Sequence, residues 1–408
     1  MSSTFRVPYS PRGADYSDLE LLALHSLLAT EETLSCGEER SAFEREFAAY
    51  VGVAPELAVA TTSCTVALEL ATYFADLRSG DNVIVTPQSY QATLNALLGL
   101  DVEVRFGDID PETLCLNPAS VEALLDQRTR AVFLTHYGGL MVRMDRLNAV
   151  LSGRDVLVVE DCAHAHGSSF KGRMAGAFGN IGCYSFQSMK NMSTLGQGGM
   201  LLLPDARMAE RARSIIAVEP DATFSPKVPS GILGPYLAGP QSVLTHEKNA
   251  FAAECISIAR HGTNSTLTEP SAAVGRVQLK RLPEFLAQRK KIANTLDTLL
   301  SAIPGIRPQH NQPDFVHSHH LYTCFCEDRI DNQTVAEAMV RQGIEVQQRY
   351  FPLHLLPEWR FRGGRLGQCP IAESIWFKHQ LNLPINPSLT DAQIEYMADA
   401  LREVMAQL

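Results

Sequence analysis

The chain has 408 residues, of which 45% are hydrophobic and 20% charged, so it is long enough for more than one structural unit and lacks the composition of a disordered or fibrous protein. Its 35 Lys and Arg against 45 Asp and Glu give a net charge of -10, which provides no electrostatic basis for binding the phosphate backbone of nucleic acid. We therefore expect a folded globular protein with no nucleic-acid partner.

The nine cysteines are an odd number without Cys-x-x-Cys spacing, which favours reduced thiols over a disulfide framework or a zinc site. No stretch approaches the roughly 18 continuous apolar residues that cross a bilayer, and the start of the chain lacks the apolar core of a signal peptide. These observations predict a cytoplasmic protein with no membrane partner.

The first part of the chain predicts an arm followed by alternating helices and strands. Residues 1–20 are polar and carry two prolines, which predicts an arm that lies on another surface. In residues 38–51 apolar side chains recur every fourth position and Gly52 follows, which is typical of an amphipathic helix ended by a glycine. Short apolar runs then alternate with helical patterns, and these runs are residues 83–85, 131–134, 156–159 and 200–203. Such strands predict a mainly parallel sheet with helices on both faces.

The second part of the chain begins with an irregular segment. Residues 218–250 are too rich in proline and glycine for a regular element, and a loop of that length is usually functional or disordered. Residues 272–300 predict a long helix, and residues 315–408 alternate strand and helix patterns as a smaller α+β unit. We therefore predict an α/β protein with an arm at 1–20, a large domain at 21–265 and a small C-terminal domain at 266–408.

The residues best suited to chemistry lie between positions 156 and 199. An apolar strand ends at Asp161, and Lys190 follows among small and apolar residues. In open α/β sheets ligands bind outside the carboxyl ends of the strands, where Asp161 would stand. A carboxylate there keeps a protonated ring nitrogen cationic, and a desolvated lysine forms Schiff bases. Together they suggest pyridoxal phosphate, although a lone strand-end Asp is more often a helix cap and a lone Lys is usually solvated.

From Glu38 to Val404 the chain resembles the DegT-type (StrS-like) aminotransferases, pyridoxal-phosphate enzymes of fold type I that aminate keto-sugars and keto-cyclitols. The resemblance rests on the motifs Glu160-Asp-Cys-Ala-His-Ala-His-Gly167, Ser185-Phe-Gln-Ser-Met-Lys-Asn191 and Gly196-Gln-Gly-Gly199. It implies an aspartate-aminotransferase-like large domain with a mainly parallel central sheet. It also implies that Lys190 is the Schiff-base lysine, that Asp161 partners the pyridinium nitrogen and that Ser185 holds a phosphate oxygen.

Three further segments share the resemblance. Ser63, Cys64 and Thr65 precede a helix whose backbone N–H groups would receive the phosphate, although a plain Ser/Thr helix cap explains them equally well. Tyr90 corresponds to the ring that the family places against the pyridine face, and a core aromatic is the ordinary alternative. Asn264 aligns with an asparagine that reaches the phosphate of the neighbouring subunit, which implies a homodimer with shared active sites, although its segment also suits a turn.

Several positions depart from the family pattern. His164 replaces a glutamine beside the phenolic oxygen of the cofactor, and histidine adds the ability to titrate near neutral pH. Gln197 replaces a glutamate, and Ser265-Thr266 replace a Tyr-Arg pair. These departures argue against a nucleotide-diphospho-sugar acceptor and leave transamination itself unaffected.

Histidines in the last third of the chain are candidate substrate contacts. His320 and His354 fall where the small domain of the family has similar elements, and we expect them near the substrate. The run His317-Ser-His319-His320 also suggests a metal site. Alternation on a strand would however point His317 and His319 to one face and His320 to the other, so we expect no metal there.

The resemblance implies an aminotransferase that moves an amino group from glutamine or glutamate to a keto-sugar, keto-cyclitol or related ketone, in secondary-metabolite or amino-sugar biosynthesis. A pyridoxal-phosphate dehydratase or epimerase is one rival, against which Lys190 argues because the family's dehydratases carry histidine there. A non-catalytic regulator usually needs a fused DNA-binding module, for which we find no spare segment. A nicotinamide oxidoreductase would need a Gly-x-Gly-x-x-Gly after the first strand, and the sequence has none there.

Overall fold

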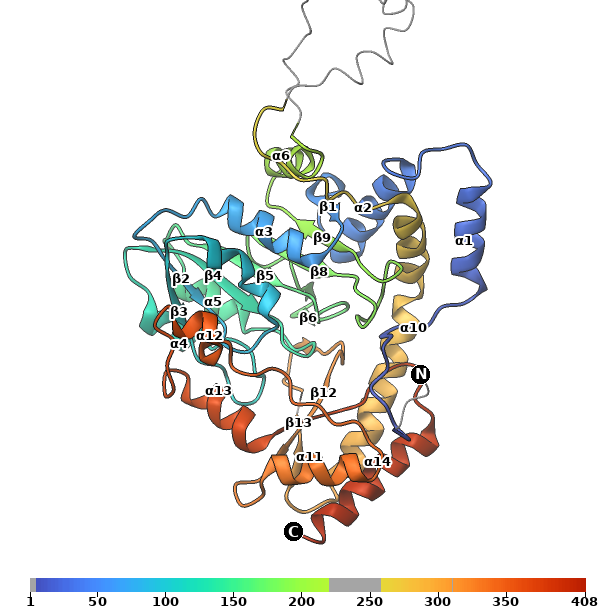
Figure 1. Ribbon diagram of the computed structural model, residues 1–408, viewed down its shortest axis with the longest axis vertical. Coiled ribbons are helices and arrows are strands. Elements are labelled where there is room, and N and C mark those ends of the chain that lie inside the picture. The colour runs from blue at the N-terminus through green and yellow to red at the C-terminus, as the bar shows by residue number, and fades with distance from the viewer. Residues whose placement is uncertain (1–4, 220–257, 310) are drawn as a thin grey trace, which may run out of the picture.

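The computed structural model describes residues 5–219, 258–309 and 311–408 (Figure 1). The predicted loop at 218–250 therefore lies, apart from its first two residues, outside the described residues. Within the described ranges, no helix is both long and apolar enough to cross a membrane.

A seven-stranded sheet in the order β1-β9-β8-β5-β4-β2-β3 forms the centre of the larger part of the molecule. Its strands are β1 (Ala58–Thr61), β2 (Asn82–Val85), β3 (Glu103–Phe106), β4 (Thr129–Thr135), β5 (Leu157–Asp161), β8 (Ile181–Ser185) and β9 (Gly199–Leu202). The strands β2, β3, β4, β5 and β8 run parallel, whereas β9 pairs antiparallel with β1 and β8. The prediction of a mainly parallel, largely buried sheet is therefore confirmed.

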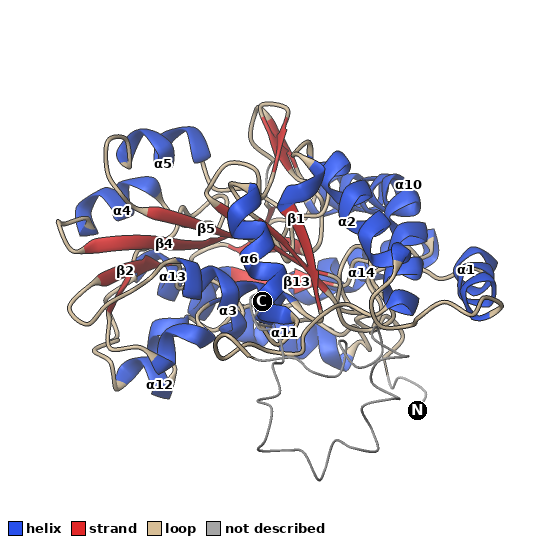
Figure 2. Ribbon diagram, turned by 90° about the horizontal axis from the view of Figure 1, so that it is seen from above, coloured by secondary structure: helices blue, strands red, loops and turns tan. Residues whose placement is uncertain are grey.

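Helices cover both faces of this sheet, and Figure 2 shows α4 and α5 on one side of the strands and α3 on the other. The helices before residue 219 are α1 (Asp18–Leu28), α2 (Glu38–Val51), α3 (Cys64–Phe74), α4 (Pro118–Leu124), α5 (Met144–Val150) and α6 (Ala206–Ile216), with 3₁₀ turns η1 (Pro55–Leu57), η2 (Gln91–Thr93) and η3 (Asn95–Gly99). The helix α2 ends as predicted, because Gly52 takes the left-handed conformation at φ 85° and closes its last turn.

The smaller part is built on a three-stranded antiparallel sheet in the order β10-β12-β13. Its strands are β10 (Ile306–Pro308), β12 (Tyr322–Cys326) and β13 (Gln380–Leu383), and its helices are α11 (Asn332–Arg341), α12 (Pro357–Arg360), α13 (Pro370–Ser374) and α14 (Asp391–Met405), with the 3₁₀ turn η4 (Leu353–Leu355) and the π turn η5 (Ile375–His379). A small third sheet joins β6 (Ser169–Phe170), β7 (Arg173–Met174) and β11 (Phe315–Val316).

The long helix α10 (Glu269–Leu300) runs beside both parts (Figure 1). Two hydrophobic clusters form the core, and α10 contributes Leu282 to the larger cluster and Leu296 to the smaller one. The predicted arm packs on the smaller cluster through Val7, which pairs with Ile344. The division into domains at residue 265 stays a prediction, because α10 belongs to both cores.

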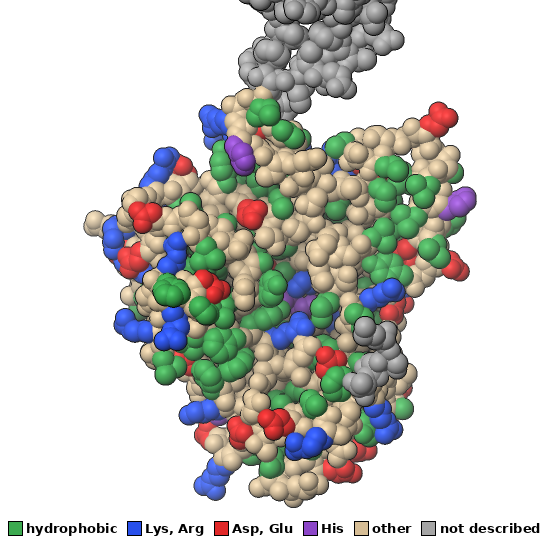
Figure 3. Space-filling model, in the orientation of Figure 1, with side chains coloured by type: hydrophobic (Ala, Val, Ile, Leu, Met, Phe, Trp, Pro, Cys, Tyr) green, Lys and Arg blue, Asp and Glu red, His purple; other side chains and the backbone are tan. Residues whose placement is uncertain are grey.

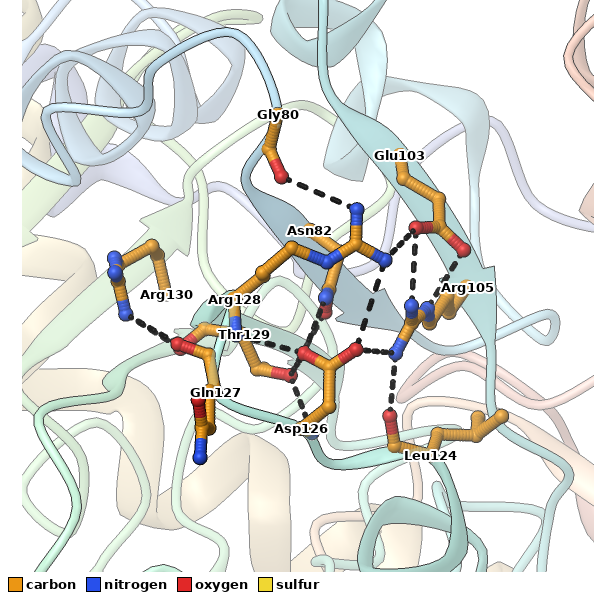
Figure 4. A network of polar contacts seen from close by, with 10 residues as sticks. All are labelled: Gly80, Asn82, Glu103, Arg105, Leu124, Asp126, Gln127, Arg128, Thr129 and Arg130. Atoms are coloured by element: carbon orange, nitrogen blue, oxygen red, sulfur yellow. Dashed lines mark hydrogen bonds and ion pairs between the residues drawn. The ribbon is translucent and has the colours of Figure 1, made fainter.

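A network of ion pairs ties together the amino ends of β2, β3 and β4 (Figure 4). Asp126 accepts a hydrogen bond from Asn82 (2.8 Å) and pairs with Arg105 (2.9 Å), while Arg105 and Arg128 both pair with Glu103. The Asn82 amide, together with the arginines, holds the pKa of the Asp126 carboxyl well below its usual range. With this edge of the sheet closed by charged side chains, the carboxyl ends of the strands form the edge available for a site.

Candidate active site

A cavity of about 610 Å³ opens at the carboxyl ends of β5 and β8. The predicted site residues that line it are Ser63, Cys64, Thr65, Tyr90, Asp161, His164, Ser185, Lys190 and His320. The structure thus brings together side chains that are spread over more than half of the sequence. Asn264 and His354 are not among the lining residues.

Asp161 is the last residue of β5 and is buried at the base of this cavity. Its carboxylate accepts hydrogen bonds from Thr93 Oγ1 (2.6 Å) and from the backbone N–H of Ala163 (3.0 Å). Burial raises the pKa of the Asp161 carboxyl, whereas these two donors and the charge of Lys190 act in the opposite direction. Among the described residues no cation lies within ion-pair distance of this buried carboxylate, although the charge of Lys190 acts on it from the same cavity.

Lys190 lines the same cavity on the loop between β8 and β9. Burial of the amine, reinforced by the charge of Arg349, lowers the pKa of Lys190 to about 8, while Asp161 and Cys64 act against this shift. The backbone of the loop is fixed because Lys190 N–H donates to Gln187 O at 2.8 Å. A lysine with this pKa presents a substantial fraction of neutral, nucleophilic amine near neutral pH.

The N-terminal arm contacts the loop between β8 and β9 that carries Lys190, the lysine loop, through Gly13. Gly13 N–H donates to Ser188 O (2.8 Å), and a Cβ at this position would collide with the carbonyl oxygens of Met189 and Lys190. The Gly13 carbonyl in turn accepts a hydrogen bond from Arg289, a fully buried guanidinium on α10. Only a glycine therefore allows the arm to lie against the lysine loop.

The start of α3 forms the second wall of the cavity. Ser63 caps this helix, because its Oγ accepts the backbone N–H of Val66 at 3.3 Å, so the helix-cap interpretation is correct for the Ser63 side chain. Gly199 lies so close that a Cβ there would stand 2.6 Å from Cys64 N. The positive end of an eleven-residue helix thus opens onto the cavity beside the hydroxyl of Ser185, an arrangement suited to an anion.

Two stacked histidines close one side of the cavity. The rings of His164 and His320 lie 4.2 Å apart, and His164 Nε2 lies 3.2 Å from the hydroxyl of Tyr350. Burial, reinforced by Lys190, holds the pKa of His164 well below its usual value. The ability of histidine to titrate near neutral pH is therefore suppressed for His164 in this environment. Because its Nδ1 accepts the N–H of Gly138, the neutral ring carries its proton on Nε2, the nitrogen beside the Tyr350 hydroxyl.

The other histidines of this region behave differently. His317 and His319 stack on each other at 4.1 Å while His320 lines the cavity, so the pattern of sides is as expected even though the segment lies between β11 and β12 rather than in a strand. His320 Nδ1 lies 3.2 Å from Asn191 Oδ1, and its Nε2 has no hydrogen-bond partner in the described structure.

Two predicted site residues lie elsewhere in this subunit. Asn264 is exposed and forms a β-bridge with Ala217, in a segment that runs beside the edge strand β1. His354 is buried against Glu373, whose Oε1 lies 2.8 Å from His354 Nε2, and it does not reach the cavity. The expectation of a substrate contact from His354 is corrected on this ground, because its ring pairs with Glu373 and packs against Phe106 of β3. Tyr90 is 61% exposed, which excludes its alternative interpretation as a core aromatic.

The structure adds residues that the sequence did not single out. Thr93, which donates a hydrogen bond to Asp161, lies inside the segment around Tyr90 that matches the family. The family motif therefore could have indicated a site role for it. Arg349 and Tyr350 line the cavity from a loop that follows α11. No local pattern marks them, because they reach the site only through the packing of the smaller part on the larger one.

These features fit pyridoxal phosphate. The buried carboxylate of Asp161, which forms no close ion pair, suits a protonated ring nitrogen. The start of α3 with Ser185 suits the phosphate, and Lys190 presents an amine of lowered pKa to the same space. The residues at each end of the cavity are therefore complementary in charge to the pyridinium and the phosphate of the cofactor.

Comparisons with known proteins agree with this assignment. Residues 16–402 match the DegT/DnrJ/EryC1/StrS aminotransferase family. The chain is 33% identical over 389 residues to the dTDP-4-dehydro-2,3,6-trideoxy-D-glucose 4-aminotransferase of Saccharopolyspora spinosa, covering 95% of this chain and 94% of the relative. It is 34% identical over 318 residues to the L-glutamine:2-deoxy-scyllo-inosose aminotransferase of Streptoalloteichus tenebrarius, covering 76% of this chain and 69% of the relative.

A solved structure shows the same likeness in three dimensions. The crystal structure of DesV from S. venezuelae, in complex with a ketimine intermediate, superimposes with a TM-score of 0.81 at 29% identity and covers 98% of this chain and 100% of that one. The fold, the cavity and these relatives lead to one conclusion: the chain belongs to the DegT/DnrJ/EryC1/StrS family and is a pyridoxal-phosphate-dependent aminotransferase.

Proposed function

We propose that the protein transfers an amino group from L-glutamine or L-glutamate to a ketone on a sugar or cyclitol. The observation that carries this proposal is the pairing of Lys190 and Asp161 in one cavity, with an anion-binding helix start beside them. The acceptor class is supported by the names of the two relatives, which act on a dehydro-sugar and on an inosose. The donor is supported by the glutamine in the second name.

We further propose a division of work among the residues. When bound, pyridoxal phosphate supplies an electron sink that makes the Cα proton of the donor labile. Lys190 carries that proton between the donor Cα and the C4′ atom of the cofactor, acting as base and then as acid. Asp161 keeps the ring nitrogen protonated, and Ser185 and the backbone at the start of α3 hold the phosphate. His164 Nε2–H donates toward the phenolic oxygen as a neutral group.

We also propose that the active protein is a homodimer with shared sites. Leucines on α1 are exposed, and Figure 3 shows hydrophobic side chains gathered over this helix; they are Leu19, Leu21, Leu22 and Leu28. Such a patch is unusual on a monomer and suits a second copy of the chain. The exposure of Asn264 supports its assignment to the phosphate of the partner's cofactor.

The proposal is tested by the two half-reactions measured separately. The wild-type protein loaded with cofactor should lose its visible absorption when L-glutamine or L-glutamate is added, release one keto acid per site, and recover the absorption with a keto-sugar or inosose. Lys190→Ala should show neither change, and borohydride treatment of the wild type should fix the cofactor to Lys190 in a peptide map. A wild type that binds the cofactor but releases no keto acid with any donor would sink the proposal.

A further inference from the structure

Arg349 is a cation in the cavity that pairs with no carboxylate of the described residues. The charged side chains lining the cavity are Asp161, Lys190 and Arg349, and Arg349 forms no ion pair within the described part of the chain. The positive charge of Arg349 acts within the cavity, because it helps to lower the pKa of Lys190. Figure 3 shows basic and histidine side chains gathered in the middle of this face of the molecule. A guanidinium in such a place is positioned to receive an anion.

The backbone of Arg349 is held by four buried side chains. Its carbonyl accepts hydrogen bonds from Tyr137, from Gln88 (3.1 Å) and from Gln380, and its N–H donates to Asn382 Oδ1 at 2.8 Å. All four of these side chains are fully buried, and they come from both parts of the molecule. Four buried side chains converge on one peptide group, so this network fixes the place from which Arg349 extends into the cavity.

The guanidinium itself is also oriented. Its Nε donates to Gln347 Oε1, and it lies 5.4 Å from the ring of Tyr9 and 5.9 Å from the ring of Tyr350. Tyr9 is in turn tied to the small domain through Leu383 O at 3.0 Å. The fork of an arginine held in this way is suited to a planar carboxylate, which accepts two parallel hydrogen bonds from it.

We propose that Arg349 binds the α-carboxylate of the amino donor, a role that rests on the proposed transamination. Every α-amino acid carries this anion on the carbon whose proton Lys190 removes, so an arginine beside Lys190 can fix that carbon within reach of the amine. A neutral sugar or cyclitol ketone has no such group. Arg349 therefore selects amino acids in the donor half-reaction and does little for a neutral acceptor.

The test compares two amines that differ in one group. L-Glutamine and L-glutaminamide share the reacting amine, but the second carries an amide in place of the α-carboxylate. For Arg349→Met we expect the concentration of L-glutamine that gives half-maximal bleaching to rise about 100-fold, the loss of a bidentate charged pair, with little change for L-glutaminamide. Arg349→Lys keeps the charge without the fork and should lie between, at about 10-fold. Equilibrium titration with 2-methyl-L-glutamine, which lacks the Cα proton, should show the same loss as a weaker Kd without turnover.

Arg341→Met is the matched control, because Arg341 is exposed in the last turn of α11 and should leave every constant unchanged. Retained cofactor absorption and an unchanged thermal midpoint establish that the Arg349 variants are folded. The proposal is overturned if Arg349→Met binds L-glutamine and 2-methyl-L-glutamine as the wild type does, or if only the acceptor half-reaction is lost, which would place a phosphate or another acceptor group at Arg349. Failure of the wild type with every amino donor would instead remove the proposed function and this role with it.

Discussion

At the scale of single residues, the reactivity of Lys190 depends on the burial of its amine. At pH 7.5 a lysine with a pKa of about 8 is neutral in about a quarter of the molecules, against about one in a thousand for an ordinary lysine. Asp161 opposes this shift by its charge, so the two residues set each other's protonation before any cofactor arrives. The reactive form of Lys190 is thus produced mainly by burial.

This pairing predicts how cofactor attachment depends on pH. Because the neutral amine is the nucleophile, the rate of pyridoxal phosphate attachment to the cofactor-free protein should rise with pH and level off above about pH 8. Asp161→Asn removes a charge that raises the pKa of Lys190, so its plateau should begin at lower pH. Stopped-flow absorbance over a pH series measures both curves. A wild-type rate that continues to rise toward pH 10 would show that Lys190 is solvated.

At the scale of elements, the N-terminal arm, α10 and the lysine loop form one unit. Gly13 carries two of the contacts, because its N–H meets Ser188 O and its carbonyl meets Arg289. Arg289 also donates to His319 O (3.0 Å) and Ile385 O (3.3 Å), so one guanidinium joins four segments. Burial lowers its pKa to about 10, which still leaves it charged at neutral pH. The lysine loop is therefore shaped by residues distant in sequence.

The contact at Gly13 predicts the effect of one added methyl group. Gly13→Ala places a Cβ against the Met189 and Lys190 carbonyls, and forcing an atom into such a site costs about 1–3 kcal/mol. We expect a lower free energy of unfolding in urea and weaker cofactor binding, measured by titrating the bound absorption. Gly99→Ala is the control, since a Cβ at Gly99 meets no atom within 4 Å. Equal stability of the two variants would show that the arm does not press on the lysine loop in solution.

At the scale of the whole molecule, residues of both subunits form each active site of the proposed dimer. Lys190 and Asp161 belong to the subunit whose cavity they line, whereas Asn264 would serve the other one. A substitution of Lys190 therefore inactivates the site of its own subunit, whereas a substitution of Asn264 would inactivate the site of the partner. A monomer would gain nothing from being mixed with another inactive monomer.

Mixing inactive subunits tests this arrangement. Lys190→Ala and Asn264→Asp should each have little activity alone, the second because a carboxylate would repel the phosphate. After unfolding and refolding as a mixture, half of the dimers are mixed and each holds one intact site, so about a quarter of the wild-type activity should return. Sedimentation measures the dimer itself, and Lys190→Ala refolded alone is the control. A mixture as inactive as its components would refute the assignment of Asn264 to the partner.

The sequence predicted those features whose cause is local or carried by a motif. Helix α2 has the predicted bounds because apolar spacing and a terminal glycine determine a helix within a few residues. Asp161 stands at a strand end because strand and motif are adjacent. The neutral state of His164 and the placing of His354 against Glu373 arise from burial after folding, which a single sequence does not display. The sequence does not mark Arg349, because its position depends on hydrogen bonds among residues as far apart as Gln88 and Gln380.

The convergence on Arg289 has a consequence for the order of assembly. The carbonyls of Gly13, His319 and Ile385 surround one guanidinium, so the enclosure of the lysine loop is incomplete until both extremities of the chain have met. In a nascent polypeptide that has passed residue 190 but not residue 385, we expect Arg289 to lack one of its acceptors and the loop of Lys190 to be held less firmly. We therefore expect stable cofactor capture only after nearly all of the chain has been synthesised.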